Sequence, residues 1–417
     1  MLMGCIADDL TGATDLGVNL VREGLSVIQV NGVPGELAVP DADAVVVALK
    51  SRTIPAGEAI LQSLAALDWL RRHGAERIYF KYCSTFDSTA QGNIGPVTEA
   101  LQAALGGRIV PGTPAYPRNQ RTVYLGHLFV GDVLLSDSGM RQHPLTPMTD
   151  ANLVRVLAAQ SRSPVGLIGC ADVEAGAAAV RARLDTLEAD GRRHAIVDAI
   201  RDEHLVAAGQ ALLDLPLVAG GAGMALGLAR HLAARARPGG GAWSPPQAPG
   251  PIAWLAGSCS QATLAQVAAV VDVVPSFRVD PFELAADGEA AGRLAARAVA
   301  ALGGRPVLVH ATAAPEALAR AQRELGVERS AHLVEEAFRG VARALSQAGV
   351  RRFVVAGGET SGAVVEALGV RALAIGPEID PGVPWTRAVG AAPAWLALKS
   401  GNFGGRDFFA KATGLLQ

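Results

Sequence analysis

Short apolar runs alternate with amphipathic stretches along most of the chain. In its first third, apolar runs stand at residues 2–7, 26–31, 44–49 and 77–82, separated by helical patterns near 12–23, 57–73 and 94–105. This alternation of strand and helix patterns predicts βαβ units, and therefore a mostly parallel sheet with helices on both faces.

The pattern changes between residues 108 and 149. There, TVYLGHLFVGDVLL predicts a β-hairpin, and SDSGMRQHPLTPMTD predicts a long ordered loop of the kind that is often functional. Alternation then resumes, with strands expected at 165–169, 194–200 and 216–219 and helices near 150–160 and 174–189.

A second change divides the chain. Residues 235–251 (RARPGGGAWSPPQAPGP) concentrate glycine and proline without periodicity, as interdomain linkers do. Strand patterns follow at 252–256, 306–311, 352–357, 372–376 and 395–401. We therefore expect an α/β protein of two domains, 1–236 and 252–417, joined by a linker at 237–251. Each domain should be a mostly parallel sheet flanked by helices, with a central cleft.

Composition narrows the class of protein. Half of the residues are apolar, 18% are charged and the formal net charge is -2, so no basic field for nucleic acid or for a membrane surface is present. No apolar run reaches the roughly 18 residues of a membrane span. The four cysteines are isolated and the eight histidines show no metal-ligand spacing, which argues against a zinc site and favours a reduced, cytoplasmic protein. A homo-oligomer remains open.

Polar residues follow the predicted strands of the first domain. In open α/β sheets such positions bind ligands, and here they could hold a polyhydroxy acid through its hydroxyls and its carboxylate. The candidate substrate residues are Asp8, Thr11, Gly12, Lys81, Ser84, Asp87 and Asp137. The alternative is structural: Asp9 or Thr11 could be a helix N-cap, and Ser, Thr and Asp are common in turns. A cap, however, needs only one of the adjacent aspartates Asp8 and Asp9.

The loops that follow strands in the second domain are rich in glycine and hydroxyl groups. G-S-C-S at 257–260 and G-G-E-T-S-G at 357–362 each lie between a strand and a helical pattern, where backbone amides suit a phosphate. No Walker A sequence occurs, and tight turns that need small residues are the alternative. The run G-G-A-G-M-A-L-G at 220–227 lacks the acidic residue of a nicotinamide site, so close packing of a helix on the sheet, or a role in holding an anionic substrate, explains it better.

Several of these motifs resemble those of the four-carbon acid sugar kinases. They are A-D-D-L-T-G-A at the start, K-x-x-S-T-x-D-S at 81–88, A-G-G-E-T-S-G at 356–362 and L-K-S-G-N-F-G at 398–404. KYCSTFDST, HPLTPMTD and LAGSCSQAT resemble the 3-oxo-tetronate 4-kinase branch. The threonate and erythronate kinases more often carry K-x-D-S-T-x-R-G, and no Arg-Gly follows here.

The resemblance implies a sugar-acid-binding first domain and a nucleotide-binding second domain. It also implies ATP-dependent phosphorylation of the 4-hydroxyl of a 3-oxo-tetronate. Its nucleotide contacts align with Ser258, Gly357, Gly358, Glu359, Thr360 and Gly401. Mg²⁺ would be held mainly by the nucleotide and water, with Glu359 as a protein contact and no dedicated metal ligands.

One of the two aspartates is expected to act as the base, and Asp9 is favoured because it lies closer to the helix start. The partners are then a small sugar acid and ATP, with no nucleic acid and no membrane. Alternatives are a threonate or erythronate kinase, a non-enzymatic cytoplasmic sugar-acid sensor and, least favoured, a dehydrogenase.

Overall fold

The structure is a computed structural model that describes residues 1–143, 145–237, 243–247, 250–390 and 393–416. It divides into two units, Met1–Ala242 and Trp243–Gln417. The linker expected at 237–251 lies in part, at 238–242 and 248–249, outside the described residues. The domain boundaries and the central cleft stay predictions.

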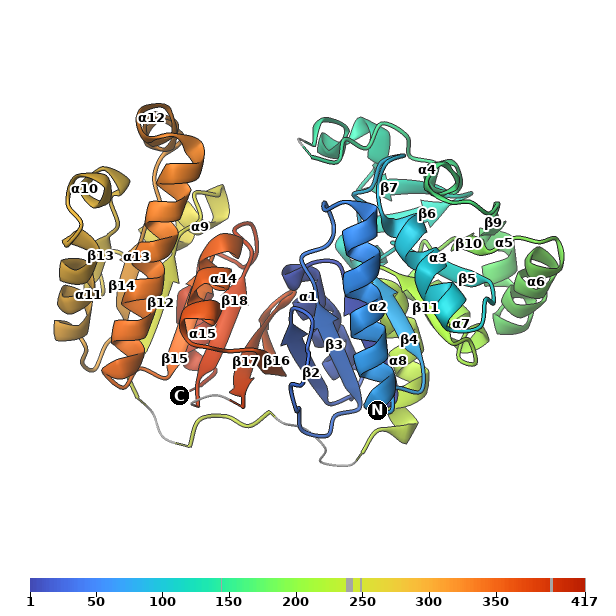
Figure 1. Ribbon diagram of the computed structural model, residues 1–417, viewed down its shortest axis with the longest axis horizontal. Helices are drawn as coiled ribbons and strands as arrows, with labels where there is room; N and C mark the ends of the chain where they lie inside the picture. The colour runs from blue at the N-terminus through green and yellow to red at the C-terminus, as the bar shows by residue number, and fades with distance from the viewer. Residues whose placement is uncertain (144, 238–242, 248–249, 391–392, 417) are drawn as a thin grey trace. The chain divides into compact units, whose positions relative to one another are not determined.

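Unit 1 contains a parallel sheet with the strand order β2-β3-β1-β4-β11-β5-β10-β9 (Figure 1). The strands are β1 (Met3–Ala7), β2 (Val27–Asn31), β3 (Ala44–Ala48), β4 (Ile78–Lys81), β5 (Val110–Thr113), β9 (Val165–Ile168), β10 (His194–Val197) and β11 (Leu217–Gly220). Most of their residues are buried, as strands covered on both faces require. The mostly parallel α/β class expected from the alternating pattern is confirmed.

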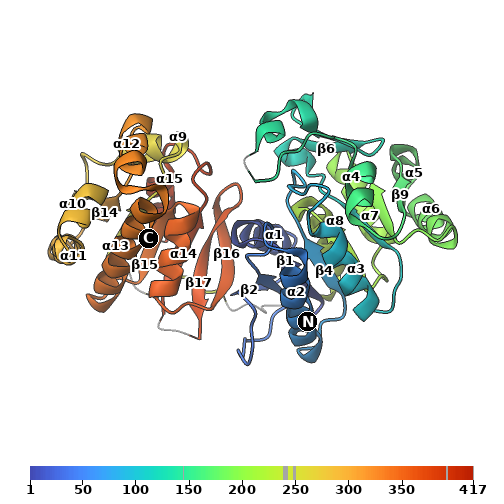
Figure 2. The same cartoon turned by 45° about the horizontal axis from the view of Figure 1, so that its top comes forward.

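Helices cover this sheet. They are α1 (Leu10–Arg22), α2 (Ala56–Arg72), α3 (Ile94–Ala104), α4 (Leu153–Gln160), α5 (Cys170–Glu174), α6 (Ala177–Ala189), α7 (Asp202–Ala211) and α8 (Ala222–Leu232). Helices α2 and α3 pack side by side, whereas α8 packs against α1 and α7 (Figure 2). Four short 3-10 helices lie at Pro117–Asn119, Leu135–Asp137, Gly139–Gln142 and Ala233–Arg235.

The predicted hairpin is confirmed as a small antiparallel sheet. It consists of β6 (Arg121–Tyr124), β7 (His127–Val130) and β8 (Val133–Leu134). The helix predicted near 174–189 is confirmed as α6, which begins at Ala177 after Gly176 at its N-cap, whereas the pattern does not predict the short helix α5 before it. Gly176 has φ 94°, which no α-helix accommodates. Strand β5 has no counterpart in the prediction, since its sequence VPGT lacks the apolar run of a buried strand.

The glycine-rich run after β11 serves helix packing. A Cβ on Gly227 of α8 would lie 2.0 Å from the carbonyl oxygen of Leu205 in α7, and one on Gly209 would lie 2.3 Å from the carbonyl carbon of Gly227. Glycine at these positions therefore lets the two helix backbones approach each other closely. Close packing accounts for Gly227, but the packing is between two helices and not, as the sequence suggests, between a helix and the sheet.

Unit 2 has the strand order β13-β14-β12-β15-β18-β17-β16. Its strands are β12 (Ile252–Ala256), β13 (Ser276–Arg278), β14 (Val307–His310), β15 (Arg352–Ala356), β16 (Ala372–Asp380), β17 (Val383–Val389) and β18 (Trp395–Lys399). Strands β13, β14, β12, β15 and β18 are parallel, whereas β17 is antiparallel to both β18 and β16. The pattern predicts the other strands of this unit but not β13 or β17.

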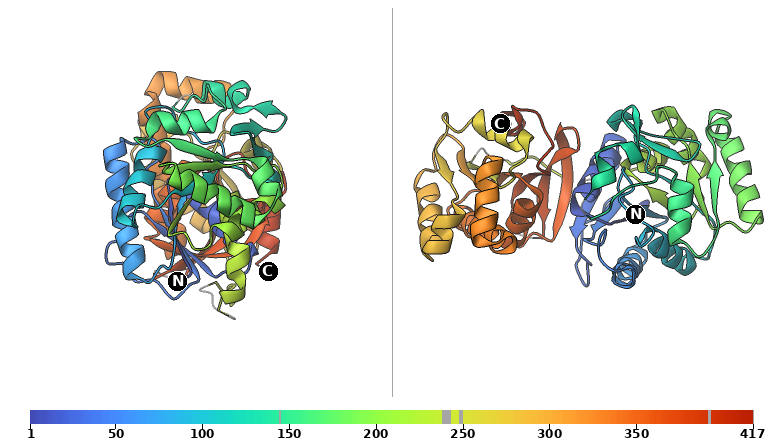
Figure 3. Two further views of the ribbon diagram at one scale, coloured as in Figure 1. Left: turned by 90° about the vertical axis from the view of Figure 1, so that its right-hand side faces the viewer. Right: turned by 90° about the horizontal axis from the view of Figure 1, so that it is seen from above.

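The helices of unit 2 are α9 (Gln261–Ala268), α10 (Pro281–Ala286), α11 (Ala290–Ala300), α12 (Pro315–Leu325), α13 (Val327–Gln347), α14 (Gly358–Ala367) and α15 (Phe408–Gly414). Residues Phe353 and Val355 of β15 pack in one core cluster with Phe338 of α13, and Val354 packs in another with Val267. Because successive strand residues point to opposite faces, helices α13 and α9 cover opposite faces of the sheet (Figure 3, right, orange and yellow).

Two exclusions drawn from the sequence can be compared with the structure. The cysteines Cys5, Cys83, Cys170 and Cys259 are all free thiols. Among the described residues, none of the helices combines the length and apolar character needed to cross a bilayer.

The packing of α7 on α8 gives a first prediction. Gly227→Ala should lower the free energy of unfolding by about 2 kcal/mol, because the added methyl group meets backbone that cannot move away. Gly340→Ala, in α13, is the matched control: no atom lies within 4 Å of its added Cβ, so it should stabilise the chain by about 0.5 kcal/mol. Chemical denaturation followed by circular dichroism measures both, and equal effects of the two changes would contradict the packing.

Candidate active site

Three neighbouring strands of unit 1, β3, β1 and β4, end at the same edge of the parallel sheet. The chain runs from β1 to β2 on one side of β1 and later crosses from β3 to β4 on its other side. Such a reversal of strand order is a topological switch point, where open α/β sheets bind ligands. The residues that follow these three strands therefore lie close together.

Arg52, which follows β3, joins three of the carboxylates at this edge. Its Nε and Nη2 atoms donate to the two carboxylate oxygens of Asp8, at 2.9 and 2.8 Å. Nη2 also donates to Asp9 Oδ1 at 2.6 Å, and Nη1 lies 3.7 Å from Asp87 Oδ2. The guanidinium group of Arg52 thus offsets part of the mutual repulsion between the three carboxylates, which are largely buried.

The two adjacent aspartates differ in their surroundings. The side chain of Asp8 is 4% exposed and both of its oxygens bind Arg52, whereas the side chain of Asp9 is 26% exposed. Asp9 Oδ1 also accepts a hydrogen bond from the Gly12 amide at 3.1 Å and caps α1. Asp9 is therefore the N-cap residue of α1, as the structural alternative predicts. Its Oδ2 has no hydrogen-bond partner among the described residues and could still bind a ligand.

Burial shifts the pKa values of three side chains at this site. Burial raises the pKa of Asp8, and the charge of Arg52 opposes that rise. Burial lowers the pKa of Arg52, but the neighbouring Asp8 raises it more, so the guanidinium group stays charged. Burial raises the pKa of the Cys83 thiol to about 11, so at neutral pH Cys83 is not a thiolate nucleophile.

The loop after β4 holds Asp87 in an uncommon backbone conformation. Phe86 and Asp87 have φ angles of 65° and 48°, in the left-handed region that residues other than glycine rarely adopt. Thr85 Oγ1 donates to Asp87 Oδ1 at 2.6 Å, and Phe86 is fully buried. Strain of this kind persists where the surrounding structure enforces it, commonly at functional sites.

Arg52 is the residue of this site that the sequence does not reveal, because a single arginine in a loop has no motif. Its segment is nevertheless held firmly. The amides of Ser51 and Arg52 donate to the Asp8 carbonyl, at 2.9 and 3.1 Å. Asn93 Nδ2, which is buried, donates to the carbonyl oxygens of Ser51, Arg52 and Ile54 at 2.7, 3.3 and 3.1 Å.

Lys81 ends β4 and lies against the first turn of α1. Its buried Nζ donates to the Tyr82 carbonyl at 2.9 Å. A Cβ on Gly12 would lie 2.7 Å from this Nζ and 2.2 Å from Asp9 Oδ1, so only glycine lets the helix start approach both groups. Lys81 and the helix N-terminus together provide positive potential for an anion.

The other predicted substrate residues have fewer contacts. Thr11 lies in the first turn of α1 and Ser84 follows β4, both half-buried. Asp137 is exposed and ends the 3-10 helix Leu135–Asp137. Among the described residues, no hydrogen bond or ion pair joins these three side chains to Arg52 or its carboxylates.

In unit 2, the predicted nucleotide residues follow three neighbouring strands, β12, β15 and β18. They lie in contact. A Cβ on Gly401 would be 2.2 Å from Ser258 Oγ, and one on Gly357, which has φ 126°, would be 3.1 Å from the Ser258 amide nitrogen. Ser260 Oγ donates to the Gly401 carbonyl at 2.6 Å.

These loops leave a helix start uncapped. Gly357 occupies the N-cap position of α14, where no side chain makes a cap hydrogen bond. Gly358 and Glu359 are exposed, while Thr360 is buried against Gly257. The first amide groups of α14 are therefore suited to an anion such as a phosphate.

Comparison with known proteins assigns the chain to a family. Residues 3–228 match the model of a sugar-binding N-terminal domain, and residues 253–409 match that of a nucleotide-binding C-terminal domain. Proteins named 3-oxo-tetronate kinase are 55% identical in Burkholderia multivorans and 56% identical in Cupriavidus necator, over 99% of this chain and 96% of each relative. The chain belongs to the 3-oxo-tetronate kinase family.

Two crystal structures are similar to this family member over nearly their whole lengths. A Salmonella typhimurium LT2 protein, proposed to be a tRNA synthase, has a TM-score of 0.93 at 46% identity, covering 100% of this chain and 99% of that one. A Haemophilus influenzae protein has a TM-score of 0.89 at 45% identity, covering 99% and 100%. The Arg52 cluster lies in the sugar-binding match and the three glycine-containing loops lie in the nucleotide-binding match.

Two further features of this kinase family member lie apart from these residues. Ligand atoms of Cys170, Glu174 and His204 lie within 4.8 Å of one another, but Arg201 Nη2 already contacts His204 Nε2 at 2.9 Å and Glu174 Oε1 at 3.5 Å. This guanidinium group would compete with a metal ion there.

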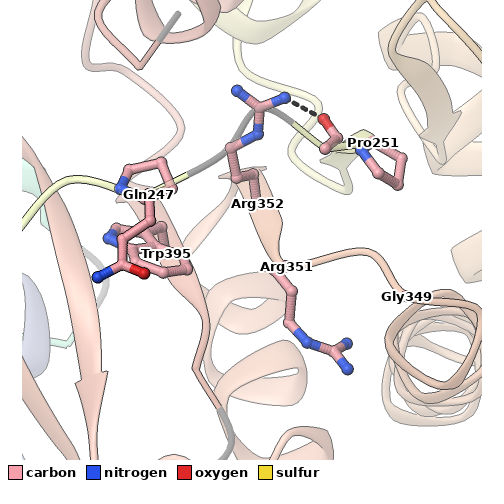
Figure 4. A pocket seen from close by; sticks show the side chains of 8 residues that line it. Gln247, Pro251, Gly349, Arg351, Arg352 and Trp395 are labelled. Carbon is pink, nitrogen blue, oxygen red and sulfur yellow. Dashed lines mark hydrogen bonds between the residues drawn. The ribbon is translucent and has the colours of Figure 1, made fainter.

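The second is a pocket of about 210 Å³ in unit 2, at the opposite ends of β15 and β18 from the nucleotide loops. Arg351, Arg352 and Trp395 are among its lining residues. Figure 4 shows the side chains of Arg351 and Arg352 pointing in opposite directions, so they do not converge on one anion. Both guanidinium groups donate to backbone carbonyls instead.

The pairing of Arg52 with Asp8 gives a second prediction. Arg52→Gln should lower the free energy of unfolding by about 3 kcal/mol at neutral pH, because Asp8 is left as a buried, unpaired charge. Without Arg52, burial raises the pKa of Asp8 further in the folded state, so the loss should shrink as the pH falls and Asp8 takes up a proton. Denaturation at several pH values measures it.

The control is Arg72→Gln, which removes an exposed pair with Asp68 in α2. Its effect should be below about 0.5 kcal/mol and nearly independent of pH. A pH-independent loss for Arg52→Gln would contradict the account of Asp8.

Proposed function

We propose that this chain transfers the γ-phosphoryl group of ATP to the terminal 4-hydroxyl of 3-oxo-tetronate, giving 3-oxo-tetronate 4-phosphate and ADP. The observation that carries the proposal is the agreement of full-length relatives, all named 3-oxo-tetronate kinase, at 46–56% identity. The two sets of residues described above fit the two substrates of such an enzyme.

Substrate binding is assigned to the Arg52 cluster. Asp9, whose Oδ2 has no hydrogen-bond partner in the described part of the chain, would accept a hydrogen bond from the 4-hydroxyl. Lys81 and the start of α1 attract the substrate carboxylate. Asp8 is assigned to the positioning of Arg52, because both of its oxygens are already occupied. Asp87, which pairs with Arg52, is the third carboxylate of the cluster.

The chemical step then has a simple balance. The hydroxyl oxygen of the substrate forms a bond to the γ-phosphorus as its proton passes to Asp9. The bond between the γ-phosphorus and the bridging oxygen breaks, and the electron pair leaves with ADP. Positioning and charge neutralisation supply most of the rate enhancement in such transfers.

Nucleotide binding is assigned to the three loops of unit 2. Ser258, Gly358 and Thr360 surround the phosphates, with Gly357 and Gly401 allowing close approach of the backbone. A Mg²⁺ ion bound with ATP neutralises charge on the phosphate oxygens. The oxygen donors at this place, among them the exposed Glu359 carboxylate, fit such an ion.

The free cysteines suit the reducing, ATP-containing cytoplasm that composition predicts. The names of the relatives favour 3-oxo-tetronate over threonate or erythronate, and a kinase over a sugar-acid sensor. The sensor alternative predicts protection from thermal unfolding by sugar acid but not by ATP.

A third prediction separates the two roles. Asp9→Asn should lower kcat by about 100- to 10,000-fold, since the base is lost, and should leave ADP binding unchanged. Ser258→Ala should weaken ADP binding by about tenfold, because one hydrogen-bonding group is lost at the phosphates. A coupled ADP-release assay with 3-oxo-tetronate, together with calorimetric titration of ADP, measures both variants.

Asp68→Asn on the exposed face of α2 is the control and should behave as the unmodified chain. Full turnover by Asp9→Asn would show that the base is another residue. Loss of ADP binding in Asp9→Asn, with normal binding in Ser258→Ala, would reverse the roles of the two units. Faster turnover of threonate or erythronate than of 3-oxo-tetronate would contradict the proposed substrate.

A further inference from the structure

Lys399, the last residue of β18, is a buried cation without an acidic partner. It is 2% exposed, and no carboxylate lies within ion-pair distance among the described residues. Its Nζ donates instead to three neutral oxygens: Thr263 Oγ1 at 3.0 Å and the carbonyls of Ser400 and Gly401 at 3.1 and 3.0 Å. A buried charge of this kind is costly unless it has a function.

The carbonyl of Gly401 is the centre of this arrangement. Besides Lys399, it accepts hydrogen bonds from Ser260 Oγ at 2.6 Å and from Thr263 Oγ1 at 2.8 Å. A carbonyl oxygen has two lone pairs, so three donors around one oxygen hold it more firmly than a turn requires.

The rest of the loop is held in the same way. Gln266 Nε2, on the same helix α9, donates to the carbonyls of Phe403, Gly404 and Gly405 at 3.0, 2.9 and 3.0 Å. Lys399 and Gln266 together therefore hold five carbonyl oxygens of the segment 400–405, those of Ser400, Gly401, Phe403, Gly404 and Gly405.

Inward carbonyls turn neighbouring amides outward. In a planar trans peptide, the C=O of one residue and the N–H of the next point in opposite directions. With the carbonyls of Ser400 and Gly401 on Lys399, the amides of Gly401 and Asn402 point away from it, and neither donates a hydrogen bond within the described part of the chain. Consecutive outward amides over a buried cation form a concave site for an anion.

We propose that Lys399 positions the nucleotide phosphates: it holds the segment 400–405 so that the amides of Gly401 and Asn402 donate to a phosphate, and it adds its own charge beneath them. The inference rests on the proposed nucleotide role of unit 2 and deepens it. Lys399 acts through the loop and does not itself touch the nucleotide.

The charge of Lys399 can be titrated. Burial lowers the pKa of its ammonium group to about 8. An anion above the loop favours the charged form, so binding strength is full below this pH and falls as the pH rises through it. Helix α9 carries no titratable side chain. Asp380 accepts from the Gly405 amide in the loop after β18 and pairs with Lys411 of α15. Among the elements in contact with β18, β15 carries Arg352, β17 carries Arg387 and α14 carries Glu359 and Glu366.

The test measures the dissociation constant of ADP between pH 7 and 9.5 by calorimetry. For the unmodified chain we expect affinity to fall by about tenfold over this range, with net proton uptake on binding near pH 8.5, seen by comparing buffers of different ionisation enthalpy. Lys399→Met should bind ADP about tenfold more weakly at pH 7 and show no further loss up to pH 9.5.

Two controls isolate Lys399 from its neighbours. Lys411→Met removes a lysine of α15 that pairs with Asp380, and it should keep the pH profile of the unmodified chain. Cys259→Ser removes a thiol from the neighbouring loop after β12, and the profile should again persist.

The inference is overturned if Lys399→Met binds ADP as the unmodified chain does, or if the unmodified chain shows a flat profile from pH 7 to 9.5. The flat profile would contradict the inference even if Lys399→Met does not fold, because it is measured on the unmodified chain. If the unmodified chain binds no ADP at any pH, the proposed function fails and this inference fails with it.

Discussion

The organisation of unit 1 depends on one guanidinium group. Asp8, Asp9 and Asp87 bring three carboxylates to one edge of a buried sheet, and Arg52 is the cation that contacts all three. Burying such charges without a partner is costly. The loops after β1, β3 and β4 must therefore bring the three carboxylates into contact with Arg52. Asn93 and the backbone carbonyl of Asp8 fix the segment that carries Arg52. The result is an aspartate, Asp9, whose position is fixed while one of its oxygens is left open to a ligand.

The candidate site of unit 2 differs from that of unit 1 in its charge. Its loops after β12, β15 and β18 carry small residues whose backbones approach one another, and the buried charge beside them is Lys399, which has no ion pair among the described residues. The carbonyls of the last loop turn inward onto Lys399 and Gln266. An acidic site suits hydroxyl groups, and an amide-rich site over a cation suits phosphates. The proposed function assigns these two kinds of site to the sugar acid and to ATP.

Much of this could be predicted from the sequence. The alternation of strand and helix patterns indicates the fold class, because strands buried on both faces have continuous apolar runs. The predicted residues Asp8, Asp9, Gly12, Lys81 and Asp87 lie together for the same reason, since each follows or ends one of two paired parallel strands. Strand β5 is not predicted because VPGT has no apolar run. The start of α6 at Ala177 is predicted a few residues too early because an isolated glycine such as Gly176 is tolerated in helical patterns.

Arg52 and Asn93 could not be predicted, and the reason is physical. Their roles depend on which strands become neighbours, and β3 and β4 flank β1 only after the chain crosses over it. Lys399 belongs to a recognised motif, but its burial and its lack of an acidic partner are properties of the folded loop. A single sequence indicates which residues end the strands, whereas the fold decides which of them meet.

The central claim, that the chain phosphorylates the terminal hydroxyl of a 3-oxo-tetronate, is tested most directly by proton-coupled ³¹P nuclear magnetic resonance of the product formed from ATP and 3-oxo-tetronate. A phosphate on the terminal carbon couples to the two protons of that carbon, so the account predicts a new phosphomonoester signal that is split by two protons and grows in step with ADP. A doublet, which reports a phosphate on a carbon with one proton, or growth of inorganic phosphate alone, would contradict it.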